Sequence, residues 1–129
     1  MPVVIANIDQ VPYLEPVLRA DGRKYVPGLG LIKAGTKGRT KFLGDEQDGP
    51  WIYVLDRPAG DVIPRHQHTS DRVEFLVEGE IEWREDDGSV TTYGPGTVSF
   101  VTRGTAYEYT VIQDSRILLW FAERPGFIG

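Results

Sequence analysis

The sequence contains no cysteine, only two histidines, and few segments in which a helix could form. Without cysteine the chain can form no disulfide bond and offers no thiolate ligand, so any bound metal must be held by nitrogen and oxygen donors. Fifteen glycines and nine prolines interrupt the 129 residues, and no window has apolar residues at helical spacing with a cap at each end. The chain is therefore predicted to be almost without helix.

Long apolar runs and an excess of positive charge are also missing. No stretch approaches the roughly 20 apolar residues of a membrane span, and the first ten residues lack the basic head and apolar core of a signal peptide. The net charge of −5 repels phosphate backbones and anionic lipid headgroups. We therefore expect a cytoplasmic protein that acts on a small molecule and has no nucleic acid or membrane among its partners.

What the sequence does contain is a series of short segments rich in β-branched and aromatic residues, separated by turn residues. The turn composition of residues 86–89, between two such segments, predicts a β-hairpin. Regular short strands with turns between them indicate a sandwich or a barrel. The expected strands cover residues 3–8, 28–34, 40–43, 51–56, 73–77, 80–85, 90–93, 97–101, 106–112 and 116–121.

The length and the 40% of hydrophobic residues suit a single domain with a substantial core. We treat residues 1–129 as one domain. Residues 1–45 are expected to hold N-terminal strands, residues 46–122 the core of a barrel, and residues 123–129 a tail. Residues 9–27 are expected to form a loop over the surface, either an ordinary loop or an arm that reaches a second subunit.

The two histidines stand one residue apart, His66 and His68, shortly after the turn signal at Gly60. In an extended strand alternate side chains project from the same face, so the two imidazoles would lie close enough to share one ligand. A divalent metal is the obvious candidate for that ligand. The alternative is a pair of solvated histidines at the edge of a strand.

The strand that follows has two unlike faces. On a regular strand Arg72 and Glu74 share the face of the histidines, and Val73, Phe75 and Val77 form the opposite, apolar face. An apolar face directed at solvent would be unusual in a monomer. Either the alternation slips in the loop before the strand, or another layer covers the apolar face. A second copy of the chain could be that layer, and we therefore predict a homodimer.

The spacing of these residues resembles that of the cupins. The first cupin motif is a glycine, five residues, His-x-His, three or four residues, a glutamate, six residues and a glycine; Gly60, His66, His68 and Gly79 occupy its places. The second motif falls on residues 96–111, where its glycines are kept. The resemblance covers about residues 50–122 and implies an all-β fold with one domain, the jelly-roll barrel or double-stranded β-helix of the cupins.

The resemblance also implies a metal site. At the positions of the family's glutamate ligand and third histidine this chain has Arg72 and Tyr107. Glu74 lies about 6.5 Å further along a regular strand and is the candidate carboxylate ligand beside His66 and His68. The expected metal is iron or zinc.

Each of these residues also has an ordinary structural interpretation. Arg72 would then form a surface ion pair with Asp71 or Glu74, which contributes little to stability. Tyr107 and Tyr109 would then be core aromatics whose hydroxyl groups reach the rim of the barrel.

The sequence leaves three classes of function open. Residues 64–69 and 103–108 look most like those of small bacterial cupins that include a dihydroxyacetophenone dioxygenase and anti-sigma-factor-like members, which implies an oxidoreductase whose iron cleaves a carbon–carbon bond beside a carbonyl. Its catalytic candidates are Tyr107, Glu74 and Arg72. The second class is a metal-free isomerase, epimerase or cyclase with a histidine base and Tyr107 as acid. The third is a binding module that senses a small molecule, and fold alone does not separate the three.

Overall fold

The computed structural model describes residues 5–18, 20, 24–26, 30–31, 37–44 and 48–123. Within these residues the one helical element is a single 3-10 turn, η1 (Ile8–Gln10), and all other regular structure is β-strand. None of these residues belongs to a helix long and apolar enough to cross a membrane. The prediction of an all-β fold is confirmed.

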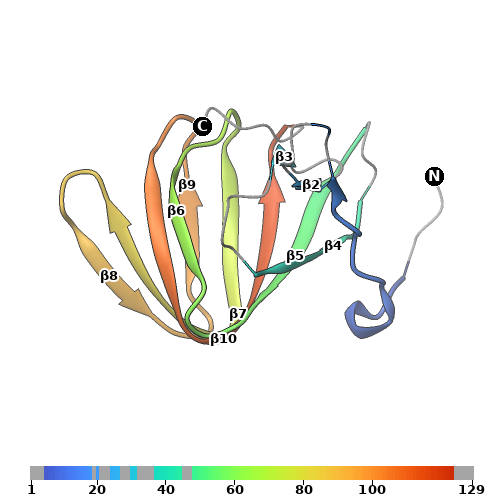
Figure 1. Ribbon diagram of the computed structural model, residues 1–129, viewed down its shortest axis with the longest axis horizontal. Helices are drawn as coiled ribbons and strands as arrows, with labels where there is room; N and C mark the ends of the chain where they lie inside the picture. Colours follow the sequence, from blue (N-terminus) through green and yellow to red (C-terminus); the bar gives the residue numbers. More distant parts are fainter. Residues whose placement is uncertain are drawn as a thin grey trace.

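Two long strands organise the barrel. Both β7 and β10 bend near their middles, so each follows one wall down, crosses the closed end and returns along the other wall (Figure 1). They pair antiparallel over almost their whole length, and all the other strands of the seven-stranded sheet attach to them directly or through β5. The strands of this sheet are β4 (Arg39–Phe42), β5 (Trp51–Arg57), β6 (Val62–His66), β7 (Arg72–Glu85), β8 (Val90–Tyr93), β9 (Val98–Val101) and β10 (Tyr107–Phe121).

A second, small antiparallel sheet is formed by the N-terminal part of the chain. Its strands are β1 (Val17–Leu18), β2 (Lys24–Val26) and β3 (Gly30–Leu31). Residues 9–27, expected as a loop, therefore contain two short strands. The loop prediction overlooked them because two or three residues show too little alternation to be recognised in a sequence.

Most of the predicted strands are present, with some differences in extent. Strands β4, β5, β8 and β9 match their predictions to within one residue at each end, and the predicted hairpin joins β7 to β8. Four predicted strands are merged in pairs into β7 and β10, and β6 was not in the predicted series. The predicted strand 3–8 is wrong, because residues 5–7 have no regular structure and Ile8 begins η1. Residues 1–4, 27–29, 32–36 and the tail 124–129 lie outside the described residues.

The bend of β7 lies at Gly79, where the chain passes very close to β10. Gly79 has a φ of 100°, and a Cβ atom there would lie 2.1 Å from the Ser115 side-chain oxygen and 2.6 Å from the Asp114 carbonyl oxygen. The bend changes which side chains face the interior: the even-numbered Leu76 is buried before it, and the odd-numbered Ile81 is buried after it. The two arms of one strand can therefore line the same interior.

Replacing Gly79 with alanine is expected to destabilise the fold strongly. The left-handed backbone alone costs a residue with a Cβ about 1–3 kcal/mol, and the contact with the backbone of β10 adds to this cost. The matched variant Gly88→Ala has a similar φ of 88° but places its Cβ in open space, so it isolates the backbone term. We expect a clearly lower urea midpoint for Gly79→Ala than for Gly88→Ala, and equal midpoints would contradict the close approach.

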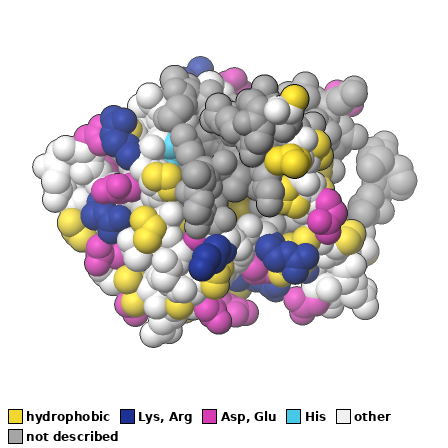
Figure 2. Space-filling model, in the orientation of Figure 1, with side chains coloured by type: hydrophobic (Ala, Val, Ile, Leu, Met, Phe, Trp, Pro, Cys, Tyr) yellow, Lys and Arg dark blue, Asp and Glu magenta, His cyan; other side chains and the backbone are white. Residues whose placement is uncertain are grey.

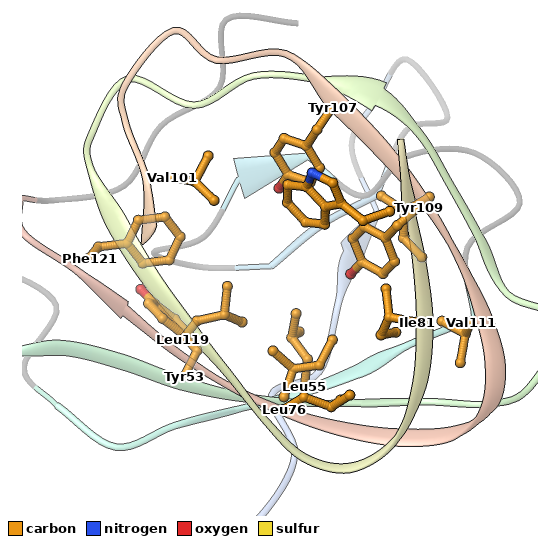
Figure 3. Close-up of a cluster of buried hydrophobic side chains, with 13 residues drawn as sticks. Tyr53, Leu55, Leu76, Ile81, Val101, Tyr107, Tyr109, Val111, Leu119 and Phe121 are labelled. Atoms are coloured by element: carbon orange, nitrogen blue, oxygen red, sulfur yellow. The ribbon is translucent and has the colours of Figure 1, made fainter. Parts of the chain in front are cut away.

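The core fills the space between the walls of the barrel. Figure 3 shows its side chains converging from both arms of the long strands on a common interior. Phe121 and Val101 lie beside one another on one side of this cluster, and Tyr107 and Tyr109 lie on the other. Buried hydrophobic side chains of this kind each contribute roughly 1.5–3 kcal/mol to folding. The polar residues discussed next lie among them.

Candidate active site

His66 and Tyr107 are brought together by strand pairing. His66 ends β6, Tyr107 begins β10, and the two are register partners, so their side chains share one face. Their ring centroids lie 4.5 Å apart. The His66 Nδ1 atom lies 2.8 Å from the Pro64 carbonyl oxygen, to which it donates when its proton is on Nδ1. That tautomer leaves the acceptor lone pair on Nε2.

His68 lies beyond the end of β6 and is held by the loop that leads into β10. The Gly104 amide donates to the His68 carbonyl oxygen at 3.0 Å. The two imidazole rings are 5.0 Å apart and nearly perpendicular, and the Tyr107 hydroxyl lies 3.3 Å from His68 Nε2. The prediction that the two histidines share one face of the barrel is confirmed by this contact, and the alternative of a solvated pair is wrong because both are about 5% exposed.

The side chains of His66, His68 and Tyr107 lie in a largely buried environment that is rich in aromatic rings. Trp83 stacks on Tyr107 with ring centroids 4.2 Å apart, and Tyr107 is 3% exposed. Only a small area of histidine surface is visible on the face in Figure 2, where side chains of both charges are interspersed over the described surface. Water is thus largely excluded from the pair formed by His68 and Tyr107.

Burial determines the protonation of Tyr107. Loss of hydration raises the pKa of Tyr107 well above 10, and the nearby Glu74 carboxylate raises it further, while Arg72 acts in the opposite direction. The phenol therefore keeps its proton at neutral pH and can donate a hydrogen bond to a ligand. The structural alternative placed its hydroxyl at the rim of the barrel, but the hydroxyl lies inside, against His68.

Arg72 and Glu74 form an ion pair inside the barrel. Arg72 Nη2 lies 3.3 Å from Glu74 Oε2, and the guanidinium carbon lies 4.6 Å from the centre of the Tyr107 ring. Both side chains are buried, so the predicted surface ion pair is present as a pair but not at the surface. Asp71, the other predicted partner of Arg72, instead accepts a hydrogen bond from the Arg103 amide.

The hydrogen-bonding capacity of this ion pair is incompletely used. Arg72 Nε, Arg72 Nη2 and Glu74 Oε2 are buried atoms for which no hydrogen-bond partner is found among the described residues. The pair is close enough for electrostatic attraction, but its geometry is poor for a hydrogen bond. A buried polar group without a hydrogen bond costs about 1–3 kcal/mol. Two donors and one acceptor are thus directed into the interior at some cost to stability.

These residues meet only part of what a metal ion needs. His66 and His68 can face one cation, and the hydrogen bond from Nδ1 to a carbonyl is the usual way of orienting a histidine ligand. Glu74, the expected third ligand, lies against Arg72, and the protonated Tyr107 is a poor donor. Among the described residues no three histidine, aspartate or glutamate side chains are grouped closely enough to hold a metal. Ligation by His66, His68 and Glu74 stays a prediction.

Sequence reasoning missed one neighbour of the candidate site, Trp83. Trp83 lies directly opposite Tyr109 in the pairing of β7 with β10 and stacks on Tyr107, the next aromatic on the same face. Trp83 is not among the site residues that the sequence predicts. The expected hairpin at residues 86–89 could have indicated the strand on which Trp83 lies. Its inward direction, however, depends on the bend at Gly79, which the sequence did not predict.

A barrel of this topology, with its polar residues clustered inside one end, is the cupin fold. The solved structure of the polyketide cyclase RemF from Streptomyces resistomycificus matches 98% of this chain and 84% of its own, with a TM-score of 0.71 and 19% identity. A candidate acetylacetone dioxygenase from Methylibium petroleiphilum matches all of this chain and 83% of its own, with a TM-score of 0.66 and 19% identity. KdgF from a Halomonas species matches 72% of this chain and 85% of its own, with a TM-score of 0.60 and 20% identity.

These likenesses confirm the predicted cupin resemblance at the level of the fold. No protein-family model matches the chain, and no curated protein matches its sequence. The structural neighbours carry names from more than one kind of chemistry. The choice among functions therefore depends on this chain's own site.

Proposed function

We propose that the protein is a small-molecule enzyme of the cytoplasm that performs acid–base chemistry beside a carbonyl group, as an isomerase or cyclase would. The observation that carries the proposal is the contact of 3.3 Å between the Tyr107 hydroxyl and His68 Nε2, inside the barrel and close to Arg72. A positioned acid and base of this kind typically accelerate proton transfer about 10²–10⁴-fold. The likeness of the fold to a polyketide cyclase supports the same class of chemistry.

The proposed roles follow from the donors and acceptors of the site. The histidine pair supplies the base: an imidazole nitrogen takes a proton from the carbon next to the substrate carbonyl. The electron pair of that C–H bond becomes the carbon–carbon double bond of an enol or enolate. Tyr107, which keeps its proton, donates to the carbonyl oxygen as its negative charge grows, and the guanidinium of Arg72 stabilises that charge. Return of the proton to another atom gives isomerisation, and attack of the new nucleophilic carbon on a second carbonyl of the same molecule gives cyclisation.

Proton exchange tests this proposal without knowledge of the natural substrate. We expect the protein to catalyse exchange of the methyl protons of ortho-hydroxyacetophenone with deuterium from D2O, measured by NMR under argon with a chelator present. The enzyme needs no oxidant for this reaction. Exchange no faster than in buffer alone, or exchange that occurs only when the chelator is left out, would contradict the proposal.

A metal-dependent dioxygenase is the second candidate, and the histidine pair favours it. The two rings lie 5.0 Å apart, and His66 is oriented by the Pro64 carbonyl. Bound iron would supply the activation of dioxygen that such chemistry needs. The prediction for this candidate is uptake of iron or zinc by protein purified without an affinity tag, lost in the His66→Ala, His68→Ala double variant. Oxygen consumption with a diketone in the iron-loaded wild type, and none in that variant, would favour this candidate over the first.

The outer face of the barrel supports the predicted homodimer. Two apolar rows cross β9, β7 and β10 on the side opposite the site, with Phe100 66% and Trp120 48% exposed. We call them the outer apolar strip, and they consist of Val73, Phe75, Val98, Phe100, Leu118 and Trp120. No slip of the alternation is needed in the loop before β7, since the odd-numbered residues of β7 before Gly79 do point outward. A contiguous exposed apolar surface of this kind is typical of an interaction site.

We expect light scattering to give twice the 14.5 kDa mass of one chain at micromolar concentration. Trp120→Glu should shift the protein to the monomer, because a carboxylate would be buried against an apolar partner surface. Ile112→Glu is the matched control: it changes an exposed apolar residue of the same strand outside the strip. A monomeric wild type, or equal dissociation by both variants, would count against the dimer.

A further inference from the structure

A cavity lies at the closed end of the barrel, away from the candidate active site. Strand β10 begins with Tyr107 in that site and reaches the closed end where it bends, near Asp114, and the bend of β7 lies beside it (Figure 1). The cavity has a volume of about 610 Å³. Of the ten described residues that line it, eight are charged, four with each sign, and Pro58 is the one apolar residue. Such a lining suits a charged ligand rather than an apolar one.

Part of this charge is already neutralised within the protein. Arg116 Nε and Nη2 donate to the two carboxylate oxygens of Asp56 at 2.7 and 3.0 Å, and Arg116 Nη1 donates to Asp9 at 3.0 Å. Asp56 also accepts a hydrogen bond from the Tyr13 hydroxyl. These groups are occupied by one another, so the charges available to a ligand are those of the other lining residues.

Three cations, Lys37, Arg39 and Arg57, form the positive wall of the cavity. Lys37 and Arg39 flank Gly38, and a Cβ atom at Gly38 would lie 2.5 Å from the nearest guanidinium nitrogen of Arg57. The glycine therefore allows this guanidinium to lie against the start of β4. Asp61 lies 3.1 Å from Arg57, whose side chain is 14% exposed. Among the described residues Asp61 is the one carboxylate in ion-pair contact with any of these three cations, so the wall keeps a surplus of positive charge.

Two carboxylates, Glu78 and Asp114, form the negative wall at the bends of β7 and β10. Glu78 is the register partner of Arg116, but that guanidinium is directed to two aspartates instead. Asp114 accepts a hydrogen bond from the Ala59 amide at 2.8 Å, which orients its carboxylate. Neither carboxylate forms an ion pair within the described part of the chain. Both are therefore available to a positively charged group.

We infer that the cavity at the closed end binds a small zwitterion, a molecule with a carboxylate and an ammonium group joined by a short chain, as in amino acids and short peptides. The carboxylate is held by Lys37, Arg39 and Arg57, and the ammonium by Glu78 and Asp114. Hydrogen bonds between charged groups are the strong ones, and a guanidinium matches the geometry of a carboxylate. This binding site lies outside the proposed catalytic residues and does not rest on the proposed function.

The balance of the lining charges selects a zwitterion over a simple ion. A simple anion is attracted by the positive wall but repelled by Glu78 and Asp114, and a simple cation meets the reverse arrangement. Like charges brought together in this way are a common source of specificity. A molecule that carries both charges gains at both walls. The volume is also sufficient, since a cavity of about 150 Å³ already accommodates benzene.

Calorimetric titration at low salt, where charges are least screened, tests the ligand class with three probes of equal chain length. ε-Aminocaproate carries both charges, hexanoate only the carboxylate, and hexylamine only the ammonium. We expect ε-aminocaproate to bind to the wild type about tenfold or more tightly than either of the other probes. No detectable binding of ε-aminocaproate, or an affinity equal to that of hexanoate or hexylamine, would overturn the inference.

Two matched variants test the place of binding. Glu78 and Glu80 flank Gly79 on β7, but only Glu78 lines the cavity. We expect Glu78→Gln to weaken the binding of ε-aminocaproate about tenfold without weakening that of hexanoate, while Glu80→Gln behaves as the wild type does. Both substitutions keep the size of the side chain, and the urea midpoint verifies that the fold is kept. Equal affinity of the two variants for ε-aminocaproate would refute the assignment of this cavity.

Discussion

Replacing Tyr107 with phenylalanine is expected to lower the rate of proton exchange about 100-fold or more, the usual contribution of a positioned acid. The substitution removes one oxygen atom and leaves the ring stacked on Trp83, so the packing of the core is nearly unchanged. His68 loses the hydroxyl that lies 3.3 Å from its Nε2, and the substrate carbonyl loses its neutral donor. Rates are measured by NMR in D2O, and circular dichroism verifies the fold.

Tyr109→Phe is the matched control for this experiment. Tyr109 is as buried as Tyr107, lies parallel to it at 6.2 Å, and has its own pKa raised mainly by burial. It is not the tyrosine in contact with the histidine. We expect Tyr109→Phe to keep the exchange rate within a few-fold of the wild type. If both variants lose activity equally, the effect is one of packing and the role of Tyr107 as acid is refuted.

Arg72→Met is expected to destabilise the protein by about 3–5 kcal/mol, because it leaves the Glu74 carboxylate buried without its partner. Both side chains lie inside the barrel, and water cannot replace the guanidinium there. The double variant Arg72→Met, Glu74→Met should recover most of the loss, since two apolar side chains of similar size leave no buried charge. Stability is measured by urea denaturation, as the free energy of unfolding extrapolated to water.

The loss of stability on removing an arginine from an ion pair should depend on how exposed the pair is, and not on the distance between the two charged groups. Arg65 and Asp86 approach more closely than Arg72 and Glu74, at 2.6 Å, but both are more than half exposed. An exposed ion pair contributes about 0–1 kcal/mol, so Arg65→Met should cost little. A loss for Arg72→Met as small as that for Arg65→Met, or no recovery in the double variant, would show that the interior pair is hydrated.

The secondary structure could be predicted closely where the sequence alternates and turn residues divide it. The hairpin from β7 to β8 is an example: an aspartate-glycine turn between two β-rich segments determines both strands and their pairing. The grouping of His66 and His68 on one face was also predictable, because alternation in an extended segment is local geometry. The short strands β1 and β2 were not, since their pairing partners rather than their own residues make them strands.

The course of the long strands could not be read from the sequence. The predicted break between residues 77 and 80 is a bend within β7. Gly79 allows this bend because it has no Cβ atom, and a Cβ atom at this position would overlap β10. Before the bend the even-numbered residues of β7 face the interior, and after it the odd-numbered residues do. No local sequence pattern predicts this change. It is this shift that places Trp83 over Tyr107, although the two are 24 positions apart by their numbers.

By itself the sequence determined the all-β class of the protein, the nitrogen and oxygen nature of its donors, and the common face of its two histidines. Each of these follows from composition or from the geometry of neighbouring residues. Only the tertiary structure decided that Arg72 turns inward to Glu74 and that Tyr107 keeps its proton against His68. The physical reason is that burial and strand register depend on segments distant in the chain, and these set the charge and hydrogen bonding of every residue in the site.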